Sequence, residues 1–167
     1  MLWERLSEAV GEGRPVYRVM HPDRQRRAML GLLCQICGGP ASRTSRGWLF
    51  LANRTGAELA AAGGAEEMLT AQPPLCLPCA GIAVRQCPSL TGRHTAVRAR
   101  KPSLWGVWGS VYRPGGRVLE EVGEGASLPY GHPGTRWLLA SQLIRELRRA
   151  TPVDLTTELA TSGIAQC

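Results

Sequence analysis

The sequence predicts an α+β protein in which a cysteine-rich core is followed by a small antiparallel sheet and a C-terminal amphipathic helix. Three observations lead to this fold class. Two Cys-x-x-Cys pairs flank the segment that opens the middle of the chain. Residues 94–112 have the alternating and apolar patterns of strands. Trp137–Arg149 carries leucines at helical spacing.

Length and composition are those of a packed globular protein. The chain has 167 residues, of which 44% are hydrophobic and 20% charged, and these values exclude a coiled coil, collagen and wholesale disorder. We expect a single domain with four parts: N-terminal helices over 1–33, a metal-binding part over 34–88, a sheet with its helix over 89–150, and a tail over 151–167.

The N-terminal part predicts three short elements. Residues 2–10 read as an amphipathic helix and residues 15–20 as a brief strand. Pro22-Asp23 marks the start of a helix over 24–33, with Asp23 as its cap.

In the middle part, the apolar run over 48–52 has the length of a strand. Residues 57–71 are rich in Ala and Glu but are broken by two glycines, which leaves a helical insertion or a loop. Residues 79–86 predict a short buried helix that Pro88 ends.

The third part predicts a sheet and a closing helix. Residues 94–100 and 104–112 read as two strands, and the turn at 114–116 leads to a third over 117–122. Residues 123–133 are expected to form a loop. In the helix predicted over 137–149, the basic end complements the C-terminal dipole.

The two Cys-x-x-Cys pairs predict a metal site formed by Cys34, Cys37, Cys76 and Cys79. Two thiolates three positions apart reach one ion because the chain turns tightly between them, and two such pairs give the closed tetrahedral set of structural zinc. Nothing else in the sequence indicates electron transfer, so zinc is favoured over an iron–sulfur cluster. The remaining cysteines are expected to be a buried thiol at Cys87 and a free terminal thiol at Cys167.

The order of knuckle, hairpin and cysteine-bearing helix resembles treble-clef zinc fingers. Cys34-Gln35-Ile36-Cys37-Gly38-Gly39-Pro40 is similar to the opening of zinc-bound HNH-type proteins, and the likeness covers about residues 30–88. The chain also resembles small uncharacterised proteins of GC-rich actinobacteria and their phages.

The HNH resemblance implies a catalytic His between the cysteine pairs, and this sequence departs from that pattern. Residues 38–75 contain no His, and Asn53 cannot act as a general base. A closed four-cysteine site also leaves no position for metal-bound water. We therefore expect a zinc module without nuclease activity.

The charge distribution points to a polyanionic partner. The net charge is +7, and the segments 14–54 and 85–117 each carry +7 while the rest carries −7. Such a basic field attracts nucleic acid, held mainly through phosphate contacts, although Arg-rich surfaces also serve solubility alone. The expected contacts are Arg24, Arg26, Arg27, Arg43, Arg46, Arg54, Arg85, Arg93, His94, Arg98, Arg100 and Lys101.

Two other functions stay open. A protein-interaction or adaptor module would use the treble clef and the acidic segments around Glu66 and Glu120 as a docking surface. An enzyme, including a degenerate HNH-type nuclease, would need an unrecognised site, for instance near Tyr130, His132 and Trp137.

The N-terminal residues are acidic where a signal peptide is basic, and the longest uncharged run, 68–84, contains three prolines. We therefore expect a cytoplasmic protein without a membrane span, whose cysteines are reduced and free to bind metal.

Overall fold

The computed structural model describes residues 1–7, 13, 20–123 and 125–162. Its elements are β1 (Leu2–Trp3), α1 (Pro22–Gly31), β2 (Arg43–Thr44), β3 (Gly47–Ala52), α2 (Gly56–Ala61), β4 (Met68–Thr70), α3 (Leu77–Gln86), β5 (Thr95–Gly115), β6 (Val118–Glu121), β7 (Ala126–Pro129), the 3₁₀ turn η1 (Pro133–Trp137), β8 (Leu138–Val153) and α4 (Leu155–Thr161). The predicted α+β class is confirmed. Within these residues, no helix combines the length and the hydropathy that crossing a membrane requires.

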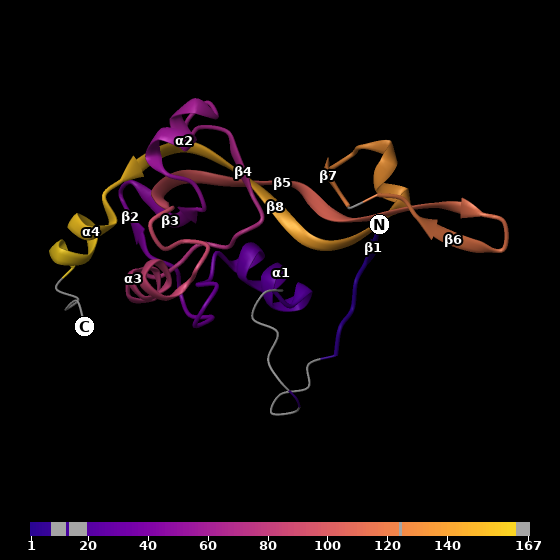
Figure 1. Cartoon of the computed structure of the whole chain (residues 1–167), viewed down its shortest axis with the longest axis horizontal. Coiled ribbons are helices and arrows are strands. Elements are labelled where there is room, and N and C mark those ends of the chain that lie inside the picture. Colours follow the sequence, from indigo (N-terminus) through magenta and orange to yellow (C-terminus); the bar gives the residue numbers. More distant parts are fainter. Residues whose placement is uncertain (8–12, 14–19, 124, 163–167) are drawn as a thin grey trace.

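Two long antiparallel strands, β5 and β8, form the spine of a curled mixed sheet (Figure 1). β3 pairs with one edge of β5, and β2 pairs with β3. β1 runs parallel to β8, whereas β4 is antiparallel to it. β6 and β7 pair with the second half of β5. In Figure 1, α2 lies above the β5–β8 pair, and α1 and α3 lie below it.

The predicted helix over 137–149 is wrong, because these residues belong to η1 and the strand β8. Leu139, Leu143 and Leu147 have the spacing of a helix face, but β8 skips one residue where Trp108 pairs with Gln142 and Gly109 with Ala140. A spacing of four residues fits a strand as well as a helix, and this bulge places Leu139 on the opposite face of β8 from Leu143.

Arg145, expected near a helix end, complements a different helix. Its side chain is buried, and its Nε donates to Met29 O at 2.9 Å. Because Met29 lies in the last turn of α1, the guanidinium satisfies a C-terminal carbonyl of that helix. A further nitrogen of Arg145 donates to Pro102 O on β5.

The helices α1 and α3 and the strand β3 are confirmed with small changes at their ends. The cap of α1 is His21, whose Nδ1 accepts the N–H of Asp23 at 3.3 Å, and Asp23 lies in the first turn instead. The segment 57–71 contains both the short helix α2 and the strand β4.

The remaining predictions need four corrections. Leu2 and Trp3 form a strand, and residues 4–7 are irregular, so the helix over 2–10 is wrong where the structure describes it. The strand predicted over 15–20 lies outside the described residues except Met20, which belongs to no element. Residues 95–115 form one strand instead of two. The expected loop contains β7, and the expected tail contains α4.

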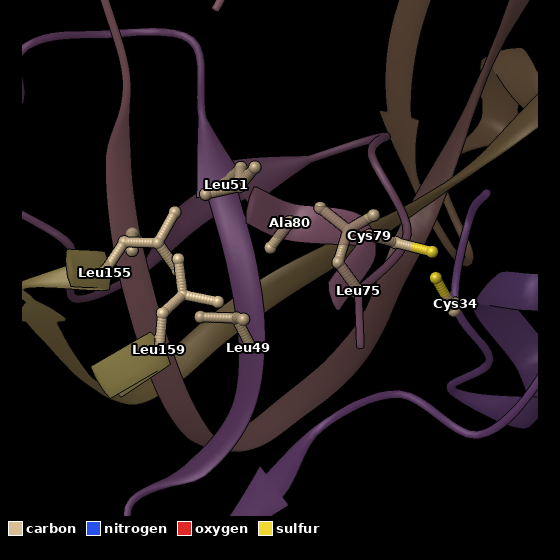
Figure 2. Close-up of a cluster of buried hydrophobic side chains, with 9 residues drawn as sticks. Cys34, Leu49, Leu51, Leu75, Cys79, Ala80, Leu155 and Leu159 are labelled. Carbon is tan, nitrogen blue, oxygen red and sulfur yellow. The ribbon is translucent and has the colours of Figure 1, made fainter. Parts of the chain in front are cut away.

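Three apolar clusters make up the core. The first joins β3 to α3 and α4 and includes two of the cysteines, Cys34 and Cys79 (Figure 2). The second, around Phe50 and Val97, fills the space between the sheet and α2. The third packs Met29 of α1 against β5 and β8. The metal-ligating residues thus lie against a packed core.

Candidate metal centre

The structure brings Cys34, Cys37, Cys76 and Cys79 together. Their sulfur atoms all lie within 4.8 Å of one another, and the Sγ atoms of Cys37 and Cys76 are 3.9 Å apart. All four are free thiols. Figure 2 shows the sulfurs of Cys34 and Cys79 pointing toward each other at the edge of the first core cluster.

The first pair lies in a tight loop closed at its base. Leu33 and Pro40 form an isolated antiparallel bridge, and the Cys34 N–H donates to Gly39 O at 2.7 Å. Gly38 donates to Cys34 O at 2.9 Å and has φ of +73°, a conformation that glycine adopts without strain. The loop therefore holds its two sulfurs on one side of the chain.

The second pair belongs to α3. Cys76 is the N-cap residue, Pro78 lies in the first helical turn, and Cys79 is buried one turn from the cap. Proline suits this position because the first N–H groups of a helix have no internal partner. The preceding residue, Leu75, donates its N–H to Leu49 O at 2.9 Å, which ties the start of α3 to β3.

Backbone N–H groups lower the pKa of one of the four cysteines, Cys34. Burial raises the pKa of Cys34, but the N–H groups of Cys37, Cys76 and Ile36 outweigh this effect and bring it to about 7. Burial raises the pKa of Cys79, and the neighbouring thiols raise it further. Four thiols this close together disfavour one another's ionisation. A bound divalent cation removes this cost, because it binds the deprotonated thiolates.

The arrangement fits zinc. A tetrahedral site with Zn–S bonds of about 2.3 Å has sulfurs about 3.8 Å apart. The separation between Cys37 and Cys76 is close to this value. A set of four thiolates favours zinc or iron and leaves no position for a catalytic water.

Comparison with protein-family models, curated proteins and solved structures finds no match to this chain.

The structure removes Arg98 from the predicted nucleic-acid contacts. Its side chain is fully buried, and its Nε donates to Glu158 Oε2 at 3.1 Å. Its Nη1 donates to the carbonyls of Ser42 and Gly47 at 3.0 and 3.2 Å. Arg98 lies on the central strand β5 and is fully buried, so it cannot reach a phosphate. Its ion pair with Glu158 instead holds α4 against the sheet.

Four other predicted contacts already have partners. Arg46 pairs with Glu158, Arg93 with Glu58, and Arg26 with Asp23. The guanidinium of Arg43 lies 4.3 Å from the centroid of the Trp48 ring. Because Arg43 is exposed and pairs with an aromatic ring, its charge stays available to an anion.

The other predicted contacts are surface residues. Arg24, Arg27, Arg54, Arg85, Arg100 and Lys101 are exposed and form no ion pair within the part of the chain that the structure describes. His94 is half-buried, with Nδ1 2.9 Å from Leu90 O.

Sequence reasoning missed Arg148 and Arg149, which it assigned to a helix end. Both are exposed, and Arg148 is the direct partner of Lys101 across β5 and β8. Only the pairing of two strands far apart in sequence brings them together, so no local pattern carried this signal.

The sheet register aligns these cations. Arg43 pairs with Trp48, Trp48 with Ala99, and Ala99 with Ala150, which makes one row across β2, β3, β5 and β8. Lys101 and Arg148 stand two positions further along on the same face. Arg100, one position from Ala99, points to the opposite face of β5, and Arg149 has a left-handed φ of +52° and no partner on β5. We call the three cations Arg43, Lys101 and Arg148 the basic row.

Cys87 and His132, which the sequence also singled out, make hydrogen bonds to residues close to them in sequence. Cys87 is half-buried and lies outside the four-cysteine group, with Sγ 3.1 Å from Ser89 Oγ. His132 caps η1 by accepting the Gly134 N–H at 3.0 Å. Cys167 lies outside the described residues.

Proposed function

We propose that this chain is a zinc-stabilised module that binds nucleic acid through its phosphates, using the basic row as the contact surface. The observation that carries this proposal is the register that aligns cations from β2, β5 and β8. Strands lie about 4.8 Å apart, so a row across four of them spans about 15 Å. This length suits several successive phosphates of one strand.

Zinc is the metal that the four cysteines would hold. The order of elements supports a treble clef, because the Cys34–Cys37 loop precedes the β2–β3 hairpin and α3 carries Cys76 and Cys79 at its start. The segment with α2 and β4 is then an insertion between hairpin and helix. In this role zinc is structural, since it fixes β3 and hence the edge of the sheet that bears Arg43.

The charges of the basic row are only partly compensated. Arg148 pairs with Glu146, and Glu66 accepts the backbone N–H groups of Arg149 and Ala150 at 3.0 and 2.8 Å. Arg43 and Lys101 form no ion pair among the described residues. The row therefore keeps a positive charge that favours phosphate and steers its approach.

The chemistry of the row favours backbone contacts over base reading. Trp48 is half-buried and covered by Arg43, so it offers little free ring surface for stacking. The exposed Arg43, Lys101 and Arg148 side chains can contact phosphates, but the row carries no helix or ribbon that would enter a groove and reach base edges. We expect binding with little dependence on sequence.

Fluorescence anisotropy of the zinc-loaded protein with single- and double-stranded DNA and RNA tests the proposal. Three phosphate contacts predict a slope of about −2 to −3 in a plot of log affinity against log salt. The triple variant R43Q/K101Q/R148Q should bind at least about tenfold more weakly, since each lost contact weakens binding. Gels of the probes should show them uncut.

The matched control is R85Q/R113Q/R136Q, which removes three exposed arginines from α3, the far end of β5 and η1. It lowers the net charge equally but leaves the basic row intact, so it should bind nearly as well as the wild type. Equal weakening by both variants would contradict the basic row. No binding at low salt would refute the nucleic-acid function.

A further inference from the structure

The hairpin formed by β5 and β6 leaves one strand edge and two apolar side chains uncovered. β6 pairs with β5 alone among the described residues. Val118 and Leu119 are 66% and 60% exposed, and Val122 after the strand is 42% exposed. Every residue of β6 is exposed, although an edge strand of this kind is a template for pairing with another strand.

The ladder shows which backbone groups face outward. Val122 donates its N–H to Val111 O at 2.7 Å, and bonded pairs recur at every second residue of an antiparallel ladder. Glu120 and Val118 therefore direct their backbone groups toward β5, whereas Leu119 and Glu121 direct theirs away. Pro114, the partner of Leu119, has no N–H to donate, which agrees with this assignment.

Two charged residues beside these outward groups form no ion pair with any residue that the structure describes. Glu120 pairs with Arg113, but neither Arg117 nor Glu121 forms an ion pair within the described ranges. Leu119 and Glu121 alternate with Val118 and Glu120, so they share one face of β6, and Arg117 lies in the two-residue turn just before the strand.

We propose that two copies of this chain associate through antiparallel pairing of β6 with β6 about a two-fold axis at Leu119. This register places Leu119 opposite its own copy and Arg117 opposite Glu121 of the second copy, twice. In this register the outward N–H and C=O groups of β6 in one copy face the outward groups of β6 in the other, so they can form hydrogen bonds. A shift by one residue in one strand would oppose outward groups to inward ones, and a register centred on Glu120 would place like charges opposite each other.

The register satisfies both unpaired charges and covers Leu119. Two hairpins then form a continuous four-stranded ribbon, which removes the open edge. An apolar groove of about 440 Å³ at the base of the hairpin, lined by Val111, Leu128 and Trp137 among others, adds apolar surface beside this interface. The interface lies at the opposite end of β5 from the cysteines and is independent of the proposed nucleic-acid function.

Sedimentation equilibrium of the full zinc-loaded chain over a concentration series tests the proposal. The wild type should reach twice the 18.0 kDa of one chain. R117E and E121R should each raise the dimer dissociation constant by about tenfold or more, because each creates two like-charge pairs, and R117E/E121R should restore association. R136E, the same charge change on η1, should leave it unchanged. A monomeric wild type, or a double variant no better than the single ones, would overturn the proposal.

A second measurement does not depend on the strength of association. Bonded partners in an antiparallel ladder have Cα atoms about 5.5 Å apart, within the range of a disulfide. Mild oxidation of L119C should therefore give a crosslink between two copies of residue 119, identified by peptide mapping. V118C should give none, since residue 118 faces Glu120 of the second copy. Crosslinking of V118C but not of L119C would show that the register is wrong.

Discussion

Breaking the buried ion pair between Arg98 and Glu158 tests how α4 is held on the sheet. Arg98 is fully buried, and Glu158 has 6% of its side chain exposed. In the variant E158Q, the guanidinium would keep its hydrogen bonds to Ser42 and Gly47 but lose its only carboxylate partner. α4 has seven residues, too few to form a stable helix alone, so its helicity depends on this packing.

The expected loss follows from the burial of the two partners. Removing one member of a buried ion pair costs about 3–5 kcal/mol, because the other charge stays buried and uncompensated. Arg46 also contacts Glu158, but its side chain is 54% exposed. Such exposed pairs contribute only about 0.2–1 kcal/mol. E158Q should therefore destabilise the protein several-fold more than R46A.

Urea unfolding of the zinc-loaded protein measures both variants. The paired replacement R98M/E158L should regain most of the stability lost in E158Q, because apolar residues of similar size often replace a buried ion pair at little cost. A loss below about 1 kcal/mol in E158Q, or an equal loss in R46A, would refute this reasoning.

Three further predictions concern the backbone of the sheet and the metal. Gln25 is fully buried and hydrogen-bonds to both the N–H and the carbonyl of Leu143. Q25A should therefore lose about 2–3 kcal/mol of unfolding free energy in urea and speed hydrogen exchange at the Leu143 amide. Unchanged exchange at Leu143 would contradict this prediction. Gly47 has φ of +105°, and a Cβ there would lie 2.0 Å from Ala99 O, so G47A should lower the melting temperature. The control G56A should not, because a Cβ at Gly56 meets no atom within 4 Å. Equal melting temperatures of the two variants would contradict this prediction. Replacing Cys34 and Cys76 by Ser should strip the metal and unfold the domain, and a folded, zinc-loaded double variant in circular dichroism and metal analysis would refute the four-sulfur site.

The cysteine site could be predicted because its signal is local. Two ligands three positions apart need only a tight turn, and the sequence supplies glycine after the first pair and proline within the second. The helices α1 and α3 were predictable for the same reason, since each has a proline in its first turn.

The long strand β8 could not be predicted from its own residues. Residues 143–149 are rich in Leu, Arg and Glu, which favour helices, and the four-residue spacing of the leucines fits a helix as well as a strand. Pairing with β5 along nearly the whole strand overrides this preference. Pro102 lies where β5 pairs with β8 alone, and there the missing N–H costs no pairing with β3 or β7.

The basic surface was predicted only in part. Arg98 looked like the other arginines because its partner, Glu158, lies 60 residues away on a helix that the sequence did not predict. Arg148 and Arg149 were assigned to a helix end for the same reason that β8 was missed. Charge blocks indicate that a surface is basic, but strand register decides which cations share it.

Metal analysis of the full chain, purified without added metal, tests the central claim most directly. X-ray absorption at the zinc edge should show four sulfur neighbours at about 2.3 Å, and elemental analysis should find one zinc per chain. A metal-free folded chain, nitrogen or oxygen neighbours at the zinc, or a disulfide between Cys34 and Cys37 would contradict the structural role assigned to the four cysteines.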